Sequence, residues 1–395
     1  MAKWDEINNW LISDGRQLGD GAAIINGYIT RLVEAGIPLS RANIAQRFSN
    51  PLLVAWGVIW TPDGTAEYDV THAMLDTDSY KGSAFEYVLA NEKPLHKSLK
   101  NLDHKTEHSS YLEFAEAGGI DLFANYLGYG DGSKNGCTFI TNELTGFSEE
   151  HIEIIQNTRH GLASAMEPVT MRRSTESLLR TYIGNDPGQA VIKGTIQRGE
   201  YAAVEAVVVI TDLRGFTAKS EQWNDAELLS ALNSYFDVVV QAIEDNGGDV
   251  LKFMGDGILS IFKIEGDVNS ETQCRKAIMA AKAALNGLDE LNDQRKAANK
   301  ESLSMGIGIN VGPVTYGNIG SPGRLDFTVL GPAVNVASRV QDLCKAIGKP
   351  VLATRQVAIH QNAEFNNEGM HAIRGVKDSI EVYSLSTWVV SNDVI

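Results

Sequence analysis

One apolar strand that ends in a carboxylate constrains the second half of this chain more than any other feature. Residues 206–211 read Ala-Val-Val-Val-Ile-Thr, and Asp212 follows directly. A continuous apolar run of this length is typical of a strand that is buried inside a sheet. A carboxylate at its end needs a partner, because the burial of an unpaired charge is costly. We therefore expect a sheet-containing domain with a charged site at one end of this strand.

Strand-like and helix-like segments alternate through the rest of the second half. Amphipathic patterns predict helices over residues 225–246, 271–291 and 334–347. The predicted strands cover residues 206–211, 250–254, 258–262, 303–311, 313–319, 327–330, 350–353 and 380–385. This βαββαβ order with additional strands predicts an α+β domain of ferredoxin-like type, with helices on one face of a mainly antiparallel sheet.

A second carboxylate, Asp256, lies in a tight Gly-Asp-Gly turn between two of the predicted strands. If these strands are neighbours of the first one, Asp212 and Asp256 meet at one edge of the sheet. Two carboxylates with room for water and phosphate oxygens suit Mg²⁺. Two such ions at one phosphate can activate an attacking oxygen and neutralise a leaving one. Taken alone, Asp256 has a simpler explanation as a turn residue.

Further candidates for phosphate binding follow along the chain. The loop after Asp212 begins with Gly215 and leads into a helix, so its backbone N–H groups are suited to an anion. Asn335 and Arg339 are four residues apart on the helix predicted over 334–347 and therefore share one face. The arginine fork matches phosphate oxygens that gain charge in a transition state, and an asparagine can orient a ribose by hydrogen bonding.

Together these motifs resemble the catalytic domain of class III adenylate and guanylate cyclases. The segments Asp-Leu-Arg-Gly-Phe-Thr, Lys-Phe-Met-Gly-Asp-Gly and Asn-Val-Ala-Ser-Arg occur in the order typical of that family, and the resemblance covers residues 201–395. It implies that Asp212, Asp256 and the carbonyl of Leu213 hold two Mg²⁺ or Mn²⁺ ions. It also implies a head-to-tail homodimer, because in this family each site takes its aspartates from one chain and its other groups from the second chain.

The resemblance also assigns the contacts to the substrate. Asn335 would position the ribose of ATP, and Arg339 would stabilise charge on the α-phosphate. The N–H groups of the loop would cradle the triphosphate, and they belong to Arg214, Gly215, Phe216 and Thr217. Relatives often add a triphosphate-binding lysine from the C-terminal hairpin, for which Lys377 is the candidate and Arg374 the alternative.

Lys252 and Thr328 are the residues that the resemblance assigns to the base. Lys252 can donate to adenine N1 and the Thr328 hydroxyl can accept from N6, whereas guanine would need an acceptor such as Glu in place of Lys252. ATP is therefore expected as the substrate, with guanylate cyclase activity as an alternative. The threonine is similar to that of the bicarbonate-responsive subgroup, so stimulation by bicarbonate is expected.

Two other interpretations of the second half are disfavoured by its residues. A catalytically silent cyclase fold that senses nucleotides or serves as a scaffold is disfavoured, because silent relatives usually lose a metal aspartate, the asparagine or the arginine. A diguanylate cyclase is suggested by Gly247-Gly248-Asp249. The diguanylate cyclase interpretation is rejected, because the signature of that family continues with an acidic residue and Phe. In this chain Val250 and Leu251 follow instead.

The first half is expected to be a separate α+β domain. A helical pattern from Trp10 to Leu32 is followed by predicted strands over residues 52–60, 110–114, 122–128 and 136–141. A helix is predicted over 148–166, which Pro168 should break or bend, and a second one over 174–183. The last strand, the link Thr-Gly-Phe-Ser-Glu-Glu and the first of these helices resemble the end of a GAF domain, and the earlier strands are compatible with a GAF- or PAS-type sheet.

This resemblance implies a sensor or dimerisation domain over residues 1–166, a helical transducer over 167–200 and a catalytic domain over 201–395. Whether the first domain binds a small-molecule effector or only dimerises stays open. Six aromatic residues are candidates for a pocket, although such residues more often belong to a core. They are Trp56, Trp60, Tyr111, Phe114, Phe123 and Tyr126.

Charge and cysteine usage restrict the partners and the compartment. The formal net charge of −16 argues against nucleic acid and anionic membranes as partners. No apolar run is long enough to span a membrane, and the first residues lack the pattern of a secretory signal. The three cysteines are scattered and odd in number, which favours a reducing compartment. A cytoplasmic protein is therefore expected.

Overall fold

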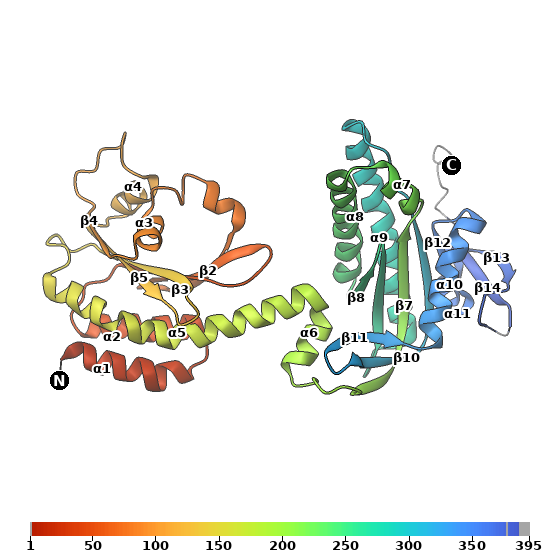
Figure 1. Ribbon diagram of the computed structural model, residues 1–395, viewed down its shortest axis with the longest axis horizontal. Coiled ribbons are helices and arrows are strands. Elements are labelled where there is room, and N and C mark those ends of the chain that lie inside the picture. The colour runs from red at the N-terminus through yellow and green to blue at the C-terminus, as the bar shows by residue number, and fades with distance from the viewer. Residues whose placement is uncertain (1, 377, 387–395) are drawn as a thin grey trace. The chain divides into compact units, whose positions relative to one another are not determined.

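The computed structural model describes residues 2–376 and 378–386 (Figure 1). The chain divides into two compact units, Met1–Thr181 and Tyr182–Ile395, and each is described by itself. The division falls inside the range that the sequence predicts as a transducer. No helix among the described residues is long and apolar enough to cross a membrane.

The first unit is a six-stranded antiparallel sheet with helices on both faces (Figure 1). The strand order is β3-β2-β1-β6-β5-β4. The strands are β1 (Arg41–Arg47), β2 (Leu53–Thr61), β3 (Gly64–Thr71), β4 (Leu95–Ser98), β5 (Asp121–Gly128) and β6 (Lys134–Thr141). The helices are α1 (Lys3–Trp10), α2 (Gly21–Glu34), α3 (Ala84–Asn91), α4 (Ser109–Glu116) and α5 (Glu149–Ile183). One core lies between the sheet and α1, α2 and α5, and a smaller one between the sheet and α3 and α4.

One local prediction for this unit is wrong, and two others differ from the structure in detail. Residues 110–114 belong to helix α4, because Tyr111, Phe114 and Ala115 recur at helical spacing against the smaller core. Pro168 does not end α5, which is continuous, since Met166 and Val169 on either side of it are buried against the sheet. The pattern from Trp10 to Leu32 is divided between two helices, with a π-helical turn, Leu11–Gly15, after the first one.

The second unit is built on an eight-stranded sheet (Figure 1). Its strands are β7 (Tyr201–Leu213), β8 (Asp249–Met254), β9 (Gly257–Ile264), β10 (Met305–Ser321), β11 (Arg324–Leu330), β12 (Val351–Thr354), β13 (Phe365–His371) and β14 (Ile380–Leu385). Its helices are α6 (Asn185–Ile192), α7 (Phe216–Gln222), α8 (Asp225–Asp245), α9 (Ser270–Ala297), α10 (Pro332–Ile347) and α11 (Arg355–Ala358). The order along the sheet is β13-β14-β12-β10-β7-β9-β8, and β11 pairs with β10.

The predicted βαββαβ order is confirmed in this unit. The four strands β10-β7-β9-β8 pair antiparallel, and β10 adds a parallel pairing with β12. The two strands predicted before and after Gly312 are the single strand β10. The expectation that helices cover only one face is wrong. Val207 and Val209 pack with α8 and α9, whereas Ala206 and Val208 pack with α10 on the opposite face, because β7 is apolar on both faces.

Helix α10 lies unusually close to strand β10. A Cβ atom on Gly308 would lie 2.4 Å from the carbonyl oxygen of Ala337, and one on Gly306 would lie 3.1 Å from the Cβ of Cys344. Only residues without a side chain permit this approach. The C-terminal half of α10 is thereby held against the sheet at the end where β7 reaches Asp212, since Gly306 pairs with Asp212.

Candidate functional site

Two aspartates meet at the end of the central strand of the second unit. Asp212 pairs with Gly257 of β9 on one side and with Gly306 of β10 on the other. Asp256 precedes Gly257 in the turn between β8 and β9, and Gly255 gives that turn a left-handed residue with φ of 68°. The structure therefore brings together the two carboxylates that the sequence predicts to be neighbours.

The electrostatics of this pair suit a divalent cation. Burial, the Asp256 carboxylate and then Asp342 of α10 raise the pKa of Asp212 to about 7. A divalent cation would remove this repulsion. No group of three or more His, Cys, Asp or Glu side chains in the described part of the chain is arranged to hold a metal. Two carboxylates that leave the other positions to water and phosphate oxygens match the way proteins bind Mg²⁺.

The loop after Asp212 is only partly available to an anion. The N–H of Arg214 donates to the Ser304 carbonyl at 2.8 Å, so this amide is already occupied. The guanidinium of Arg214 donates to the carbonyls of Cys344, at 3.1 Å, and Lys349. The amides of Gly215, Phe216 and Thr217 make no hydrogen bond within the described residues. Of the four backbone amides predicted to bind phosphate, only those of these three residues are therefore available.

Asn335 and Arg339 occupy an exposed face of α10. Arg339 donates to the Asp342 carboxylate at 2.9 Å. Among the described residues, no hydrogen bond or ion pair joins Asn335 or Arg339 to Asp212 or Asp256. Within one chain the two sets of predicted catalytic groups thus remain without direct contact.

Lys252 has a partner that the sequence reasoning missed. Its ammonium forms an ion pair with Asp326 of β11. Thr328 is two residues further along β11 and is buried, with 8% of its surface exposed. Residues two apart on a strand share a face, so the period-two spacing from Thr328 is the signal that could have identified Asp326. Arg374 is exposed, and Lys377 lies outside the described residues.

Comparison with known proteins agrees with this geometry. Residues 200–387 match the family model of the adenylate and guanylate cyclase catalytic domain. Residues 200–387 are therefore similar to the catalytic domains of adenylate and guanylate cyclases.

Similar proteins include cyclases from several organisms. An adenylate cyclase of Anabaena cylindrica is 35% identical over 41% of this chain and 32% of that protein. A terminal-differentiation-specific adenylate cyclase of Dictyostelium discoideum is 33% identical over 40% of this chain and 7% of that protein. The solved adenylyl cyclase CyaB of P. aeruginosa is 25% identical, with a TM-score of 0.44, over 50% of this chain and 99% of that one. The matches thus span about a third or less of these two curated relatives.

Two of the cavities among the described residues belong to the first unit. One, of about 550 Å³, lies between the sheet and α3 and is lined by groups that include Asn43, Ala45, Tyr68, Phe85 and Phe114. Of the six predicted aromatic candidates, only Phe114 lines it. Trp60, Tyr111 and Phe123 are buried in the cores, and Tyr126 packs against the smaller core.

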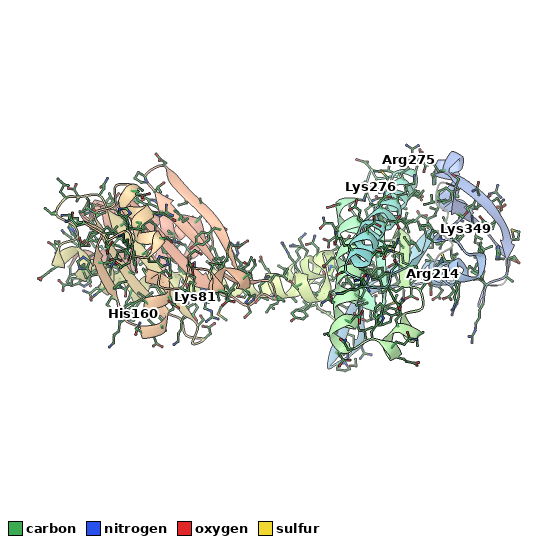
Figure 2. All side chains as sticks on the ribbon, turned by 90° about the horizontal axis from the view of Figure 1, so that it is seen from above. Lys81, His160, Arg214, Arg275, Lys276 and Lys349 are labelled. Carbon is green, nitrogen blue, oxygen red and sulfur yellow. The ribbon has the colours of Figure 1, made fainter. Side chains whose placement is uncertain are left out.

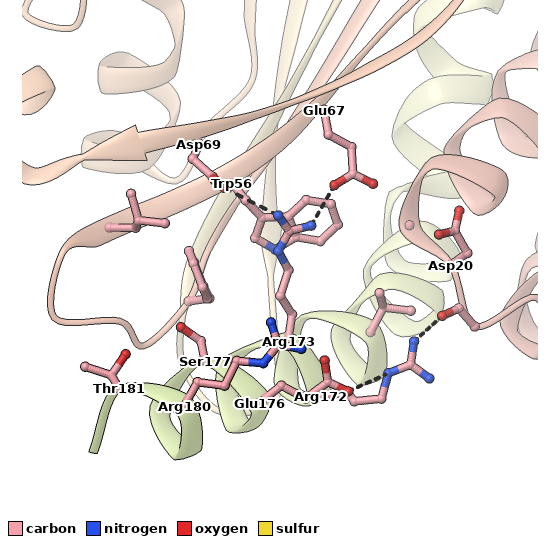
Figure 3. Close-up of a pocket in the computed structure, with 15 residues that line it drawn as sticks. Asp20, Trp56, Glu67, Asp69, Arg172, Arg173, Glu176, Ser177, Arg180 and Thr181 are labelled. Carbon is pink, nitrogen blue, oxygen red and sulfur yellow. Dashed lines mark hydrogen bonds and ion pairs between the residues drawn. The ribbon is translucent and has the colours of Figure 1, made fainter. Parts of the chain in front are cut away.

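The second cavity, of about 510 Å³, lies beside the C-terminal part of α5 (Figure 3). Arg173 lies over the ring of Trp56 at 4.4 Å and pairs with Glu67 at 2.7 Å and with Asp69 at 3.4 Å. Arg172 and Glu176, one turn apart, also pair. These opposite charges satisfy one another, so the cavity wall does not present a surface of a single sign.

The raised pKa of Asp212 predicts a pH-dependent stability. In metal-free buffer the folded protein keeps a proton on Asp212 between about pH 4 and pH 7, where the unfolded chain has lost it. The free energy of unfolding should therefore fall as the pH rises through that window. Asp256→Asn should lower the pKa of Asp212, although the burial of Asp212 persists. The free energy of unfolding of this variant should therefore fall less between these pH values. The measurement is the urea midpoint at about pH 5 and about pH 7.5 in EDTA.

The matched control is Asp267→Asn, because Asp267 is exposed and follows the C-terminal end of β9, whereas Asp256 precedes its first residue. Asp249, whose pKa is raised to about 6 by burial and by Asp186, acts in the same direction. For this reason the test is the difference between variants and not the absolute slope. An equal pH dependence in Asp256→Asn and the wild type would show that the two carboxylates do not interact.

Proposed function

We propose that this protein is an adenylate cyclase that converts ATP to 3′,5′-cyclic AMP and pyrophosphate. The observation that carries the proposal is the pair of aspartates at the sheet edge of a cyclase domain, Asp212 and Asp256, whose mutual repulsion a divalent cation would relieve. The names of the relatives from Anabaena and Dictyostelium support adenylate as the substrate class.

The reaction is an in-line displacement at the α-phosphorus. A bond forms between the ribose 3′-oxygen and the α-phosphorus, the bond from the α-phosphorus to the bridging oxygen breaks, and pyrophosphate leaves. The proton of the 3′-hydroxyl passes to water or to a substrate phosphate. Two bound Mg²⁺ or Mn²⁺ ions would favour loss of that proton and neutralise charge on the leaving group.

The chain's own residues bind and orient the substrate in this proposal. The carboxylates of Asp212 and Asp256 and the carbonyl of Leu213 would hold the cations. The amides of residues 215–217 would bind the triphosphate. Asn335 would orient the ribose, and Arg339 would stabilise the charge that develops on the α-phosphate.

A homodimer is part of the proposal because the two sets of groups are not in contact within one chain. Asn335 and Arg339 lie on an exposed face of α10. A second copy arranged head to tail would bring its α10 to the aspartates of the first and complete two equivalent sites. The ion pair between Arg339 and Asp342 would then be exchanged for contact with phosphate.

For base recognition we propose that Lys252 donates to adenine N1 and that Thr328 accepts from N6. Asp326 supports this assignment because its ion pair holds the ammonium of Lys252 on the face of β11 that also carries Thr328. Asp326 is itself an acceptor, so it is the competing candidate for N6. Guanylate cyclase activity would require the opposite donor pattern.

We further propose that the first unit regulates the cyclase domain as a GAF-like sensor. The six-stranded antiparallel sheet and the cavity of about 550 Å³ beside α3 support a small-molecule effector. The range predicted as a transducer ends on the catalytic sheet. Asp186 of α6 binds α6 to this sheet, because its carboxylate accepts from Lys263 of β9 and Tyr316 of β10. A signal that moves α6 would act directly on β9 and β10.

The first test is cyclic nucleotide production by the purified full-length chain with ATP or GTP and with Mg²⁺ or Mn²⁺. Cyclic AMP should form from ATP, and Asp256→Ala should lower the rate at least about a hundredfold because a cation ligand is lost. Asp267→Ala, the exposed control, should leave it unchanged. No product from a folded dimer under any metal would favour the silent cyclase fold.

The shared site is tested by mixing two inactive variants. Asp212→Asn removes a metal ligand, and Arg339→Ala removes the phosphate contact. Each variant alone should be inactive, and co-refolded mixtures should recover up to about a quarter of wild-type activity through mixed dimers with one intact site. Failure of the mixture to recover activity while mixed dimers form would contradict the composite site.

Base recognition is tested by the ratio of kcat/KM for ATP to that for GTP. Thr328→Val should lower this ratio by about tenfold to a hundredfold because N6 loses its acceptor, and Thr328→Ser should retain it. Asp326→Ala should weaken ATP use through misplacement of Lys252. If Thr328→Val leaves the ratio unchanged and Asp326→Ala abolishes the preference, Asp326 is the acceptor for N6.

Bicarbonate is the first effector to test, because of Thr328. The cyclase rate should rise during a bicarbonate titration at constant pH and constant ionic strength. The matched control replaces bicarbonate with chloride. A comparison of the bicarbonate response of Thr328→Ser with that of Thr328→Val shows whether the hydroxyl is needed. A rate that stays flat in the wild type removes bicarbonate as an effector.

A further inference from the structure

The guanidinium of Arg214 caps the C-terminal end of helix α10. It donates to the carbonyls of Cys344, at 3.1 Å, and Lys349. The Cys344 carbonyl also accepts from the amides of Gly348 and Lys349, both at 3.1 Å, where α10 ends in a left-handed residue. Figure 2 labels Arg214 and Lys349 in the second unit. A positive charge at this place also complements the negative end of the helix dipole.

Arg214 is equally tied to the aspartate loop. It follows Asp212 and Leu213 directly, and its own N–H donates to Ser304 just before β10. The guanidinium therefore joins the loop that carries the aspartate pair to the end of α10. Cys344 strengthens the far end of this link, because it is buried and its thiol donates to the Ile307 carbonyl at 3.3 Å.

The same end of α10 carries a contact to one of the predicted catalytic groups. Asp342, in the last turns of α10, accepts from Arg339 at 2.9 Å. A shift of the aspartate loop that Arg214 passes to the end of α10 would therefore reach the part of the helix that holds Arg339.

Stability alone does not account for this arginine. Its Nε is buried and has no hydrogen-bond partner among the described residues. A buried donor without an acceptor is unfavourable, because its hydrogen bond to water is not replaced. The arrangement is better explained by a requirement for a fixed distance between the loop and the helix.

We propose that Arg214 is a positioning residue that transmits occupancy of the aspartate pair to α10, the helix that carries Asn335 and Arg339. This inference rests on the proposed function for its consequence. In a head-to-tail homodimer the loop of a chain serves one catalytic site and its α10 serves the other. Arg214 then makes each chain a mechanical link between the two sites, and coupling of this kind is reciprocal.

The link is tested first without any catalytic readout. Hydrogen exchange of the peptide that covers residues 340–349 is measured in the full-length protein with and without Mn²⁺. In the wild type, Mn²⁺ should slow exchange at least about fivefold, the low end of ordinary coupling. In Arg214→Met, Mn²⁺ binding followed by electron paramagnetic resonance should persist while the slowing disappears.

Two further variants separate coupling from a loss of structure. Arg214→Lys keeps the charge but offers only a compact ammonium, so it should fold and retain part of the slowing. Arg275→Met removes a surface arginine that pairs with Glu271 one turn away on α9, and this variant should behave as the wild type. Equal slowing in Arg214→Met and the wild type overturns the proposal, as does the absence of any Mn²⁺ effect on α10 in the wild type.

The second test uses the mixed dimer with one intact site. Arg214→Met is placed either in the Arg339→Ala chain, which supplies the aspartate loop, or in the Asp212→Asn chain, which supplies α10. The proposal expects kcat to fall about tenfold in both placements, with KM for ATP changed less. If kcat falls only when Arg214→Met is in the chain that supplies the loop, the proposed link to α10 is wrong. An inactive wild type would reject the proposed function, while hydrogen exchange would still decide the role of Arg214.

Discussion

The placement of two aspartates at one sheet edge is the constraint on which the second unit depends. Asp212 reaches its position only because β7 pairs with β9 and β10 in one register, with glycines opposite it on both sides. A slip of one residue would turn Asp212 toward the face that α8 and α9 cover. The slip is prevented because β7 buries apolar side chains on both faces, so either set would lose its core.

The position of α10 follows from the same edge. Gly306 and Gly308 let the helix approach β10 closely, and Arg214 then caps its C-terminal end. The proposed role of Arg214 would pass geometry near the aspartates to the helix that presents Asn335 and Arg339. In the proposed enzyme a divalent cation would therefore do more than bind substrate, because it would also act on a helix that serves the other site.

The first unit shows how far local patterns reach. The sequence predicts the strands at 122–128 and 136–141 because both are long and apolar. It also predicts the start of α5, where the Ser148 hydroxyl accepts from the His151 amide. Strand β1 was missed because its exposed positions carry Arg41, Asn43 and Arg47, and only its pairing with β2 and β6 makes it a strand. The helix around Tyr111 was mistaken for a strand because a short apolar run fits either period. Continuity of α5 through Pro168 was decided by packing on both sides of the proline.

The sequence by itself determined the order of elements in the second unit and which of its residues are candidates for a site. The buried strand before Asp212, the Gly-Asp-Gly turn and the spacing of Asn335 and Arg339 are local patterns, and the βαββαβ order follows from patterns of this kind. The tertiary structure alone decided which groups interact. It paired Lys252 with Asp326, occupied the amide and guanidinium of Arg214, and brought the charge of Asp342 near enough to raise the pKa of Asp212. These contacts join segments that are about 70 to 130 residues apart, and such separations leave no periodic trace in a sequence because only the folded sheet brings them together.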